Sequence, residues 1–396
     1  MKINPSISLR NWQKRAFDNW VQNDHKGIFS VVTGGGKTIF AIYCISYLFE
    51  NDLVDSVVVV VPTKTLQDQW VSNFVQTTNV DRSDISLNRK KFKLINIFTN
   101  LSLQKVPMSD LQNRYAIILD ECHRYGTDKN LSFLDHNYYS TIGLTATLER
   151  KYDDGVERIL IPKIGRVIYN YDITEALNDG VVESYKMIYL RTHFNEDEEL
   201  EYQELSNQIS ILIARLNNSE DHSKIEKIKR SIEMLSFKRR RVVNESYQRK
   251  FVATRIILNN INRKKIIFCE SIKQAEEIRD ICLSNGLSTL IYHSRMKQSD
   301  RISVLNDFQS NYFHTLIGCK ALDEGFDVPD IDFGIIVSQT KTSRQRIQRL
   351  GRTIRKSKDK VQPVIYTLYT TEDEYSSLYE EQFNNPNIEV EWMEVK

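Results

Sequence analysis

Residues 28–41 read IFSVVTGGGKTIFA, an apolar run followed by a glycine-rich turn and then by the start of an amphipathic segment. This order predicts a buried strand, a tight turn and a helix. Consecutive glycines let backbone N–H groups converge at a helix N-terminus, where they bind phosphate. Lys37 would reach the outer phosphates of a nucleotide, and the Thr38 hydroxyl would ligate Mg²⁺. The strict phosphate-loop pattern has glycine where Val31 stands. The predicted nucleotide-binding residues of this turn are Thr33, Gly34, Gly35, Gly36, Lys37 and Thr38.

A pair of carboxylates ends another apolar run, at residues 115–119. The carboxyl ends of parallel strands are where open α/β sheets bind ligands, so Asp120 and Glu121 are expected beside the glycine turn. Asp120 is predicted to hold Mg²⁺ together with Thr38, and Glu121 to deprotonate the water that attacks the terminal phosphate.

Short apolar runs alternate with longer mixed segments in both halves of the chain, which is typical of parallel sheets with crossover helices. The first half contains the candidate strands 28–32, 56–61, 93–98, 116–119 and 141–144. The second half contains the candidate strands 265–269, 288–292, 315–319, 333–337 and 364–368. The sequence therefore predicts an α/β protein with two parallel-sheet domains in tandem.

Leucine and isoleucine recur at helical spacing over residues 205–216 and again over 225–235, which predicts a helical hairpin inserted at about 195–250. The basic run Lys238–Arg241 in this insertion is either a solvated face or a nucleic-acid contact. The predicted domains are 1–166, 167–371 including the insertion, and an acidic tail at 372–396. The tail is interpreted as a solvated terminus or a partner-docking segment.

The net charge is +2, but Lys396 is the only basic side chain among residues 372–396, so the rest of the chain is more basic than the total suggests. A polyanionic partner is consistent with this distribution. No apolar run is long enough to span a bilayer and no signal region begins the chain, so a cytoplasmic protein without a membrane partner is expected. Five scattered cysteines without a CxxC pair indicate neither a zinc site nor a disulfide framework.

Asp120-Glu121-Cys122-His123 resembles the DExH box of superfamily 2 helicases, and the other sequence blocks of that superfamily follow in the expected order over nearly the whole chain. Residues 9–13 are similar to its adenine-reading segment, 61–70 to block Ia and 145–147 to block III. Residues 266–269 resemble block IV, and 321–329 resemble block V. Residues 348–355, QRLGRTIR, fit block VI at every fixed position.

The resemblance implies two RecA-like domains and a set of residue roles. Gln13 would read adenine, and Asp327 would contact the nucleotide. His123, Thr145, Thr147 and Gln348 would couple hydrolysis to strand movement. The residues expected to touch the nucleic-acid backbone are Pro62, Thr63, Lys64, Thr99, Ser294 and Arg295.

Block VI also has a chemistry that the residues themselves indicate. Residues 341–360 contain nine basic side chains and one acid, and Arg349, Arg352 and Arg355 recur at every third position. Guanidinium groups suit phosphoryl oxygens better than ammonium groups do. Arg352 and Arg355 are therefore the candidate arginine fingers, with Lys37 and Glu121 the other catalytic residues.

The sequence thus predicts an ATP- and Mg²⁺-dependent helicase or translocase that hydrolyses ATP at the cleft between its two domains. The helical insertion and residues 62–70 resemble the XPB-like and restriction-subunit-like DNA branch, which favours DNA as the partner. An RNA helicase, or a nucleotide-gated binding subunit with little unwinding of its own, are the alternatives. The short chain also suggests a separate targeting or nuclease partner.

Overall fold

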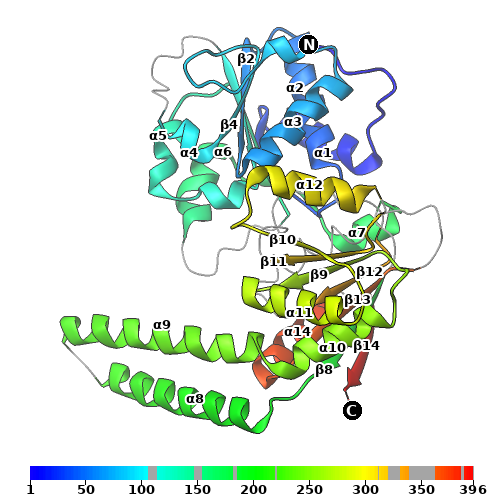
Figure 1. The fold of residues 1–396 in the computed structure, drawn as a ribbon. Coiled ribbons are helices and arrows are strands. Elements are labelled where there is room, and N and C mark those ends of the chain that lie inside the picture. Colours follow the sequence, from blue (N-terminus) through cyan, green and yellow to red (C-terminus); the bar gives the residue numbers. More distant parts are fainter. Residues whose placement is uncertain are drawn as a thin grey trace. The chain divides into compact units, whose positions relative to one another are not determined.

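The computed structural model describes residues 1–105, 114–146, 154–181, 185–218, 221–310, 312–319, 331–338, 362–384 and 388–395. The chain divides into two compact units, with the change from unit 1 to unit 2 near residue 182. Each unit contains a seven-stranded sheet flanked by helices (Figure 1). The two predicted parallel-sheet domains are therefore confirmed.

The sheet of unit 1 is parallel throughout its described pairings. Its strand order is β3 (Ile85–Ser86), β4 (Ile95–Thr99), β2 (Ser56–Val61), β5 (Tyr115–Asp120), β6 (Ser140–Thr145), β1 (Lys26–Val31) and β7 (Val167–Tyr171). Every residue of β2, β5 and β6 is buried, which explains the nearly continuous apolar sequences of β2 and β5. The carboxyl ends of all these strands meet at one edge.

The sheet of unit 2 is also parallel in its described pairings. Its strand order is β10 (Leu290–His293), β11 (Thr315–Cys319), β9 (Lys265–Cys269), β12 (Phe333–Ile336), β13 (Val364–Tyr369), β8 (Lys186–Arg191) and β14 (Glu389–Glu394). The helices beside it include α11 (Ile272–Ser284), α12 (Gln298–Gln309) and α14 (Glu372–Asn384). Strands β8 and β14 were not among the candidate strands.

Three helices of unit 1 begin at or near the carboxyl edge of its sheet. They are α1 (Asn11–Gln22), α2 (Lys37–Glu50) and α3 (Lys64–Thr77). Helix α2 directly follows the glycine turn after β1, and α3 begins three residues after β2. Helix α3 is capped by the Thr63 hydroxyl, which accepts a hydrogen bond from the Leu66 N–H at 3.3 Å.

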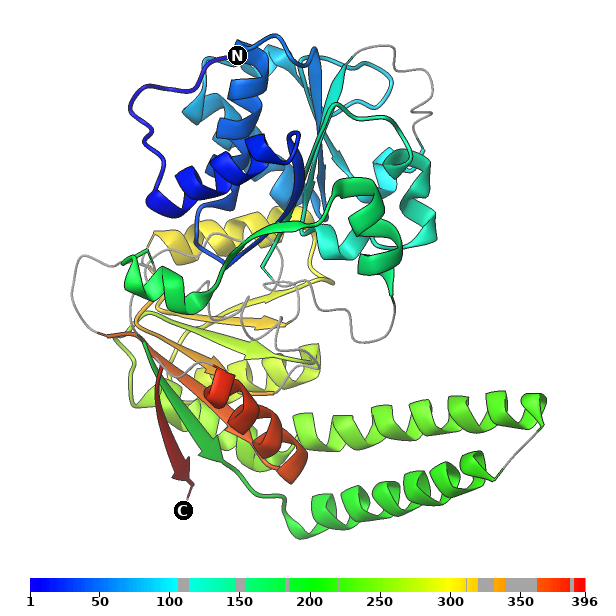
Figure 2. The ribbon, with the colours of Figure 1, turned by 180° about the vertical axis from the view of Figure 1, so that it is seen from behind.

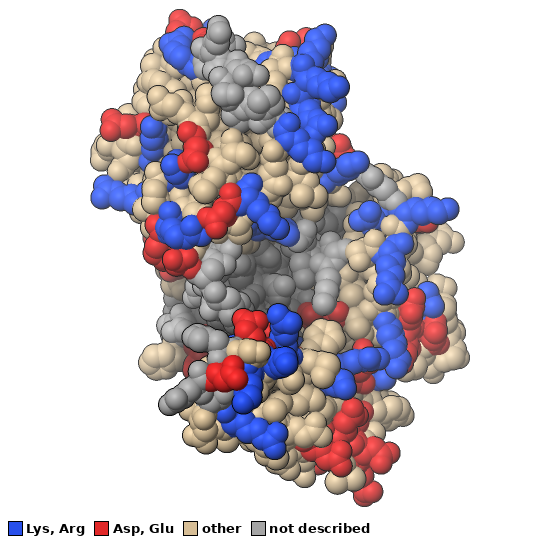
Figure 3. Space-filling model, turned by 90° about the vertical axis from the view of Figure 1, so that its left-hand side faces the viewer, with Lys and Arg blue, Asp and Glu red and all other residues tan. Residues whose placement is uncertain are grey.

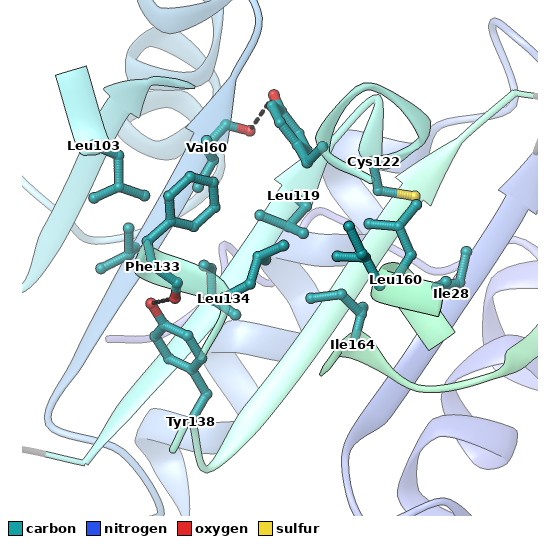
Figure 4. Packing of buried hydrophobic residues seen from close by; sticks show 14 of the residues in the cluster. Ile28, Val60, Leu103, Leu119, Cys122, Phe133, Leu134, Tyr138, Leu160 and Ile164 are labelled. Atoms are coloured by element: carbon teal, nitrogen blue, oxygen red, sulfur yellow. Dashed lines mark hydrogen bonds between the residues drawn. The ribbon is translucent and has the colours of Figure 1, made fainter. Parts of the chain in front are cut away.

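An apolar cluster supports this edge from one face of the sheet (Figure 4). It contains the Cys122 side chain, which is fully buried directly after the two carboxylates. A Cβ atom at Gly143 would lie 3.0 Å from Ile28 Cγ1 and 3.2 Å from Cys122 Sγ, so a side chain there would force these neighbours to shift. The turn that carries the carboxylates is thus held by its own buried cysteine.

The predicted helical hairpin is present in unit 2. Helices α8 (Glu196–Asn217) and α9 (His222–Asn244) lie side by side and extend away from the sheet (Figures 1 and 2). Asn195 caps α8 through the Glu198 N–H, at 2.9 Å. Leu205 and Ile209, two residues of the predicted helical pattern, are buried. Helix α10 (Tyr247–Leu258) then returns the chain to the sheet.

The boundary predicted at residue 166 differs from the structure. Residues 167–171 form β7, which pairs with β1 and belongs to the sheet of unit 1. Helix α7 (Ile173–Asn178) follows it before the chain enters unit 2. Strand β7 is an edge strand in which Tyr171 is buried and the other four side chains are exposed or half-buried, so its burial signal is weaker than that of the central strands.

The predicted acidic tail is also different in the structure, because residues 372–384 and 389–394 are part of unit 2. They form α14 and β14, and β14 extends the sheet beside β8. The Trp392 ring lies 4.6 Å from that of Tyr189 and 4.9 Å from that of Tyr375, measured between centroids. Several acidic side chains of this added layer are exposed, among them Glu372, Glu389 and Glu394, whereas Trp392 packs against Tyr189 and Tyr375.

All five cysteines are free and buried, as expected of fillers. Among the residues that the structure describes, no helix is long and apolar enough to cross a membrane.

Candidate nucleotide and nucleic-acid site

The glycine turn after β1 has the backbone that a phosphate loop requires. Gly34 and Gly36 have φ angles of 82° and 100°, in the region that side chains disfavour. A Cβ atom at Gly35 would lie 2.8 Å from Val31 Cγ1 and 3.0 Å from the Val32 carbonyl oxygen. Gly34 and Gly36 are therefore needed for their backbone conformation, and Gly35 is needed because a side chain would not fit. Helix α2 then starts at Lys37, so its N-terminal N–H groups face the turn.

The Lys37 ammonium donates a hydrogen bond to the Val31 carbonyl at 3.0 Å and so lies back along the turn. The buried Thr33 Oγ1 has no hydrogen-bond partner among the described residues. A buried hydroxyl without a partner is unusual, and a ligand oxygen would satisfy it. These features fit the triphosphate and Mg²⁺ that the sequence predicted for this turn.

Three side chains at the start of α1 bind the carbonyl groups of the same turn. Arg10 Nη1 and Trp12 Nε1 donate to the Gly35 carbonyl at 2.9 and 3.1 Å. Gln13 Nε2 donates to the Gly36 carbonyl at 3.0 Å, and Gln13 Oε1 accepts from the Arg10 N–H at 2.8 Å. Gln13 thus lies beside the glycine turn, with its amide engaged by the protein.

The two carboxylates lie on the same edge as the glycine turn. Strands β1 and β5 are separated only by β6, and the charge of Lys37 acts on Asp120. Burial raises the pKa of Asp120 to about 6, and the charge of Glu121 adds to that rise. A hydrogen bond from Trp70 and the charge of Lys37 oppose it. Asp120 Oδ2 accepts from Trp70 Nε1 at 2.9 Å.

Glu121 adopts a left-handed backbone conformation, with φ of 53° and ψ of 51°. A non-glycine residue there costs about 1–2 kcal/mol, and such strain gathers at functional sites. Its side chain keeps 22% of its surface exposed, whereas Asp120 is 7% exposed. Glu121 is therefore the more accessible of the two carboxylates at the strand end, as a residue that activates water must be.

His123 connects the carboxylate turn with β6. Its Nδ1 lies 2.9 Å from Thr145 Oγ1 and 3.5 Å from Glu121 Oε2. The structure therefore brings together two of the four predicted coupling residues and places them beside the predicted base. The remaining two, Thr147 and Gln348, lie outside the described residues, as do Asp327, Arg352 and Arg355.

The positions predicted to contact nucleic acid in unit 1 lie next to one another. Pro62, Thr63 and Lys64 follow β2, Thr99 ends β4, and Val61 pairs with Thr99 in the sheet. Lys64 is exposed and Thr99 is half-buried, with its hydroxyl 3.0 Å from Ser102 Oγ. Figure 3 shows Lys and Arg side chains grouped along one edge of this unit.

Ser294 and Arg295 follow β10 in unit 2, and both are exposed.

Sequence reasoning gave no role to Trp70, Arg10 or Trp12. Arg10 and Trp12 lie close to Gln13 in the chain. Their place in the segment that resembles the adenine-reading block could therefore have indicated a role for them. Trp70 lies fifty residues from Asp120 along the chain, and only the pairing of β2 with β5 brings α3 to the carboxylate. Nothing local in the sequence indicated that contact.

Two family models match the chain. Residues 6–150 match the model described as "Type III restriction enzyme, res subunit". Residues 248–357 match the model described as "Helicase conserved C-terminal domain". The two matches cover the carboxylate turn, the glycine turn and block VI.

Curated relatives align over most of this chain. The DNA 3'-5' translocase XPB2 of Sulfurisphaera tokodaii is 27% identical, over 90% of this chain and 81% of that protein. Putative helicase 22 of a Sulfolobus islandicus filamentous virus is 23% identical, over 90% of this chain and 63% of that protein. The putative DNA 3'-5' helicase Rad25 of Haloarcula marismortui is 25% identical, over 93% of this chain and 54% of that protein. The chain thus spans little more than half the length of some of these relatives.

Solved structures share the fold. The helicase domain of Pyrococcus furiosus Hef aligns with a TM-score of 0.60 and 16% identity, over 94% of this chain and 98% of that chain. The Type ISP restriction-modification enzyme LlaBIII, solved bound to DNA, aligns with a TM-score of 0.66 and 14% identity, over 98% of this chain and 31% of that chain. These likenesses support two RecA-like units in tandem.

Proposed function

Because this chain belongs to superfamily 2 of the helicases, among the XPB-like and restriction-subunit-like members, we propose that it hydrolyses ATP to translocate along DNA or to separate its strands. The observation that carries the proposal is the shared edge in unit 1. There the glycine turn, the Asp120-Glu121 pair and the His123–Thr145 contact follow neighbouring strands of one sheet.

The roles at the nucleotide follow from that edge. The N–H groups of residues 33–38 and the Lys37 ammonium would bind the phosphates, and Thr38 with Asp120 would hold Mg²⁺. The ion supplies positive charge to the transferring phosphoryl group. Glu121 would orient and deprotonate the attacking water. Gln13 would contact the edge of the adenine base once its amide releases the hydrogen bond to the Gly36 carbonyl and binds the base instead.

The second half of the chain supplies the remaining proposed catalytic groups. Arg352 and Arg355 would act as arginine fingers, and Asp327 would contact the nucleotide, on the strength of the block VI and block V sequences. Block VI falls within the matched helicase C-terminal domain.

DNA is the proposed track. The relatives named for an activity on DNA cover most of this chain. In unit 1, Pro62, Thr63, Lys64 and Thr99 would contact the phosphate backbone, and Ser294 and Arg295 would do so in unit 2. Backbone contacts give affinity without sequence preference, as a translocase requires. Through its contact with Thr145, His123 would couple DNA binding to ATP hydrolysis. A targeting or nuclease partner stays a prediction.

The test is ATP turnover measured alone and with single-stranded DNA, duplex DNA and RNA of matched length. We expect DNA to stimulate turnover more than RNA does, and Lys37→Ala to abolish turnover with every substrate. Greater stimulation by RNA would favour the alternative RNA helicase. Nucleotide-dependent DNA binding with no turnover on any substrate would favour the gated binding subunit.

A further inference from the structure

Helix α3 reaches the predicted metal ligand through a buried tryptophan. Trp70 is 1% exposed, and its ring nitrogen donates to Asp120 Oδ2 at 2.9 Å. Its ring also packs against Phe74 on the same helix, with centroids 5.9 Å apart. One oxygen of the Asp120 carboxylate is therefore bound by a donor that is itself buried and packed against a second ring.

The rest of α3 is fixed to the sheet at two further points. Gln67 Nε2 donates to the Ile97 carbonyl at 2.6 Å, and Thr63 caps the first turn of the helix. The N-terminus of α3 follows Pro62 and Thr63, which are proposed to contact the nucleic-acid backbone. The same helix therefore begins next to the residues proposed to contact nucleic acid, and its second turn carries the Trp70 side chain that binds Asp120.

The chemistry of the donor suits a carboxylate that must also bind a cation. An indole N–H is a neutral donor, so it orients the carboxylate without cancelling its charge as lysine or arginine would. Hydrogen bonds of this kind set the orientation of metal ligands, and their loss weakens metal binding.

We propose that Trp70 is a positioning residue for Asp120, holding it in the orientation that binds Mg²⁺ with the nucleotide and linking α3 to that site. The inference rests on the proposed function, because Asp120 is the proposed metal ligand. In this proposal Trp70 acts through the Asp120 carboxylate, to which it donates a hydrogen bond.

Trp70→Phe removes the N–H while keeping an aromatic ring, and Trp20→Phe is its matched control. Trp20 is fully buried in the same unit, and its ring nitrogen has no hydrogen-bond partner among the described residues. Both variants lose the same atoms from a packed core, but only Trp70→Phe loses a hydrogen bond. A general packing defect would therefore appear in both.

Binding of Mg²⁺ to the protein saturated with ADP is measured by calorimetry, independently of turnover. We expect Trp70→Phe to raise the dissociation constant for Mg²⁺ about tenfold, in the range seen when partners of metal ligands are removed. Trp20→Phe should match the wild type within about twofold, and ADP affinity without Mg²⁺ should be unchanged in both. Equal Mg²⁺ affinity in all three proteins would overturn the inference.

Full-length protein labelled with 5-fluorotryptophan provides a test that does not depend on the folding of a variant. Adding Mg²⁺ to the ADP complex should shift the Trp70 fluorine signal and leave the Trp20 signal in place. An unmoved Trp70 signal in a complex that does bind Mg²⁺ would contradict the positioning role. If the wild type binds no Mg²⁺ in the presence of ADP, the proposed function itself fails. This outcome differs from one in which Mg²⁺ binds normally and only the role of Trp70 is contradicted.

Discussion

Glu374→Ala should strongly destabilise unit 2, because it leaves a buried arginine without its partner. Arg249 in α10 is fully buried, and its Nη2 lies 2.5 Å from Glu374 Oε2 at the start of α14. The same carboxylate oxygen accepts from the backbone N–H groups of Thr370 and Thr371, at 2.8 and 3.1 Å. This carboxylate therefore fixes the segment that the sequence suggested was a solvated tail.

The expected loss is about 3–5 kcal/mol in the free energy of unfolding, the usual cost of removing one partner from a buried ion pair. Arg249 keeps two other contacts, from Nε to Thr370 Oγ1 at 2.9 Å and from Nη1 to the Val337 carbonyl at 3.3 Å. Neither of these acceptors carries a charge, so neither compensates for the lost carboxylate. Because a domain is stable by only about 5–15 kcal/mol, the loss is a large fraction of the total.

Glu372→Ala is the matched control two residues away. Glu372 pairs with Arg191 at 2.7 Å, but its side chain is 73% exposed and that of Arg191 is 40% exposed. Water screens such a pair, so its removal should cost less than about 1 kcal/mol.

Urea denaturation followed by circular dichroism gives the two free energies, and hydrogen exchange of β14 shows whether the C-terminal layer loosens. We expect Glu374→Ala to lower stability by at least about 2 kcal/mol more than Glu372→Ala and to speed exchange in β14. Equal stability of the two variants, with unchanged exchange, would refute the account of this buried pair.

Further predictions concern the nucleotide edge. Gly36→Ala should weaken ATP binding and cost about 1–2 kcal/mol of stability, measured by calorimetry and urea denaturation, because φ is 100° there and a Cβ would lie 3.0 Å from Gln13 Nε2. Since the pKa of Asp120 is about 6, protons should compete with Mg²⁺, and affinity for Mg²⁺ should fall about tenfold between pH 7 and pH 5; a flat profile would contradict this. His123→Ala should leave turnover without DNA within about threefold but remove its stimulation by DNA, because the contact with Thr145 is lost.

The central strands were predictable because they are buried on both faces. Strand β2 consists of a serine followed by five valines, and a continuous run of β-branched apolar residues is typical of a strand that is buried on both faces. Edge strands carry a weaker signal. Strand β14 alternates acids with Val390 and Trp392, and the charge of that segment was interpreted as solvation, although the alternate side chains pack on the sheet.

The glycine turn was predictable because its residues are consecutive in the sequence, so their order alone indicates a phosphate-binding loop. Contacts made across the sheet were not. The hydrogen bond from Trp70 to Asp120 depends on which strands are neighbours, and the pair of Arg249 with Glu374 joins residues more than one hundred positions apart. The boundary near residue 182 was missed for the same reason, since β7 joins unit 1 through its pairing with β1.

The proposed motor depends on Glu121 activating the water that attacks ATP, and Glu121→Gln tests this most directly. The measurement is ATP binding and DNA-stimulated turnover in the wild type and the variant, side by side. The amide retains the shape of the side chain but takes up no proton, so binding should persist while turnover falls about 10²- to 10⁴-fold. Unchanged hydrolysis in Glu121→Gln would contradict the assignment of Glu121 and, with it, the proposed chemistry of this edge.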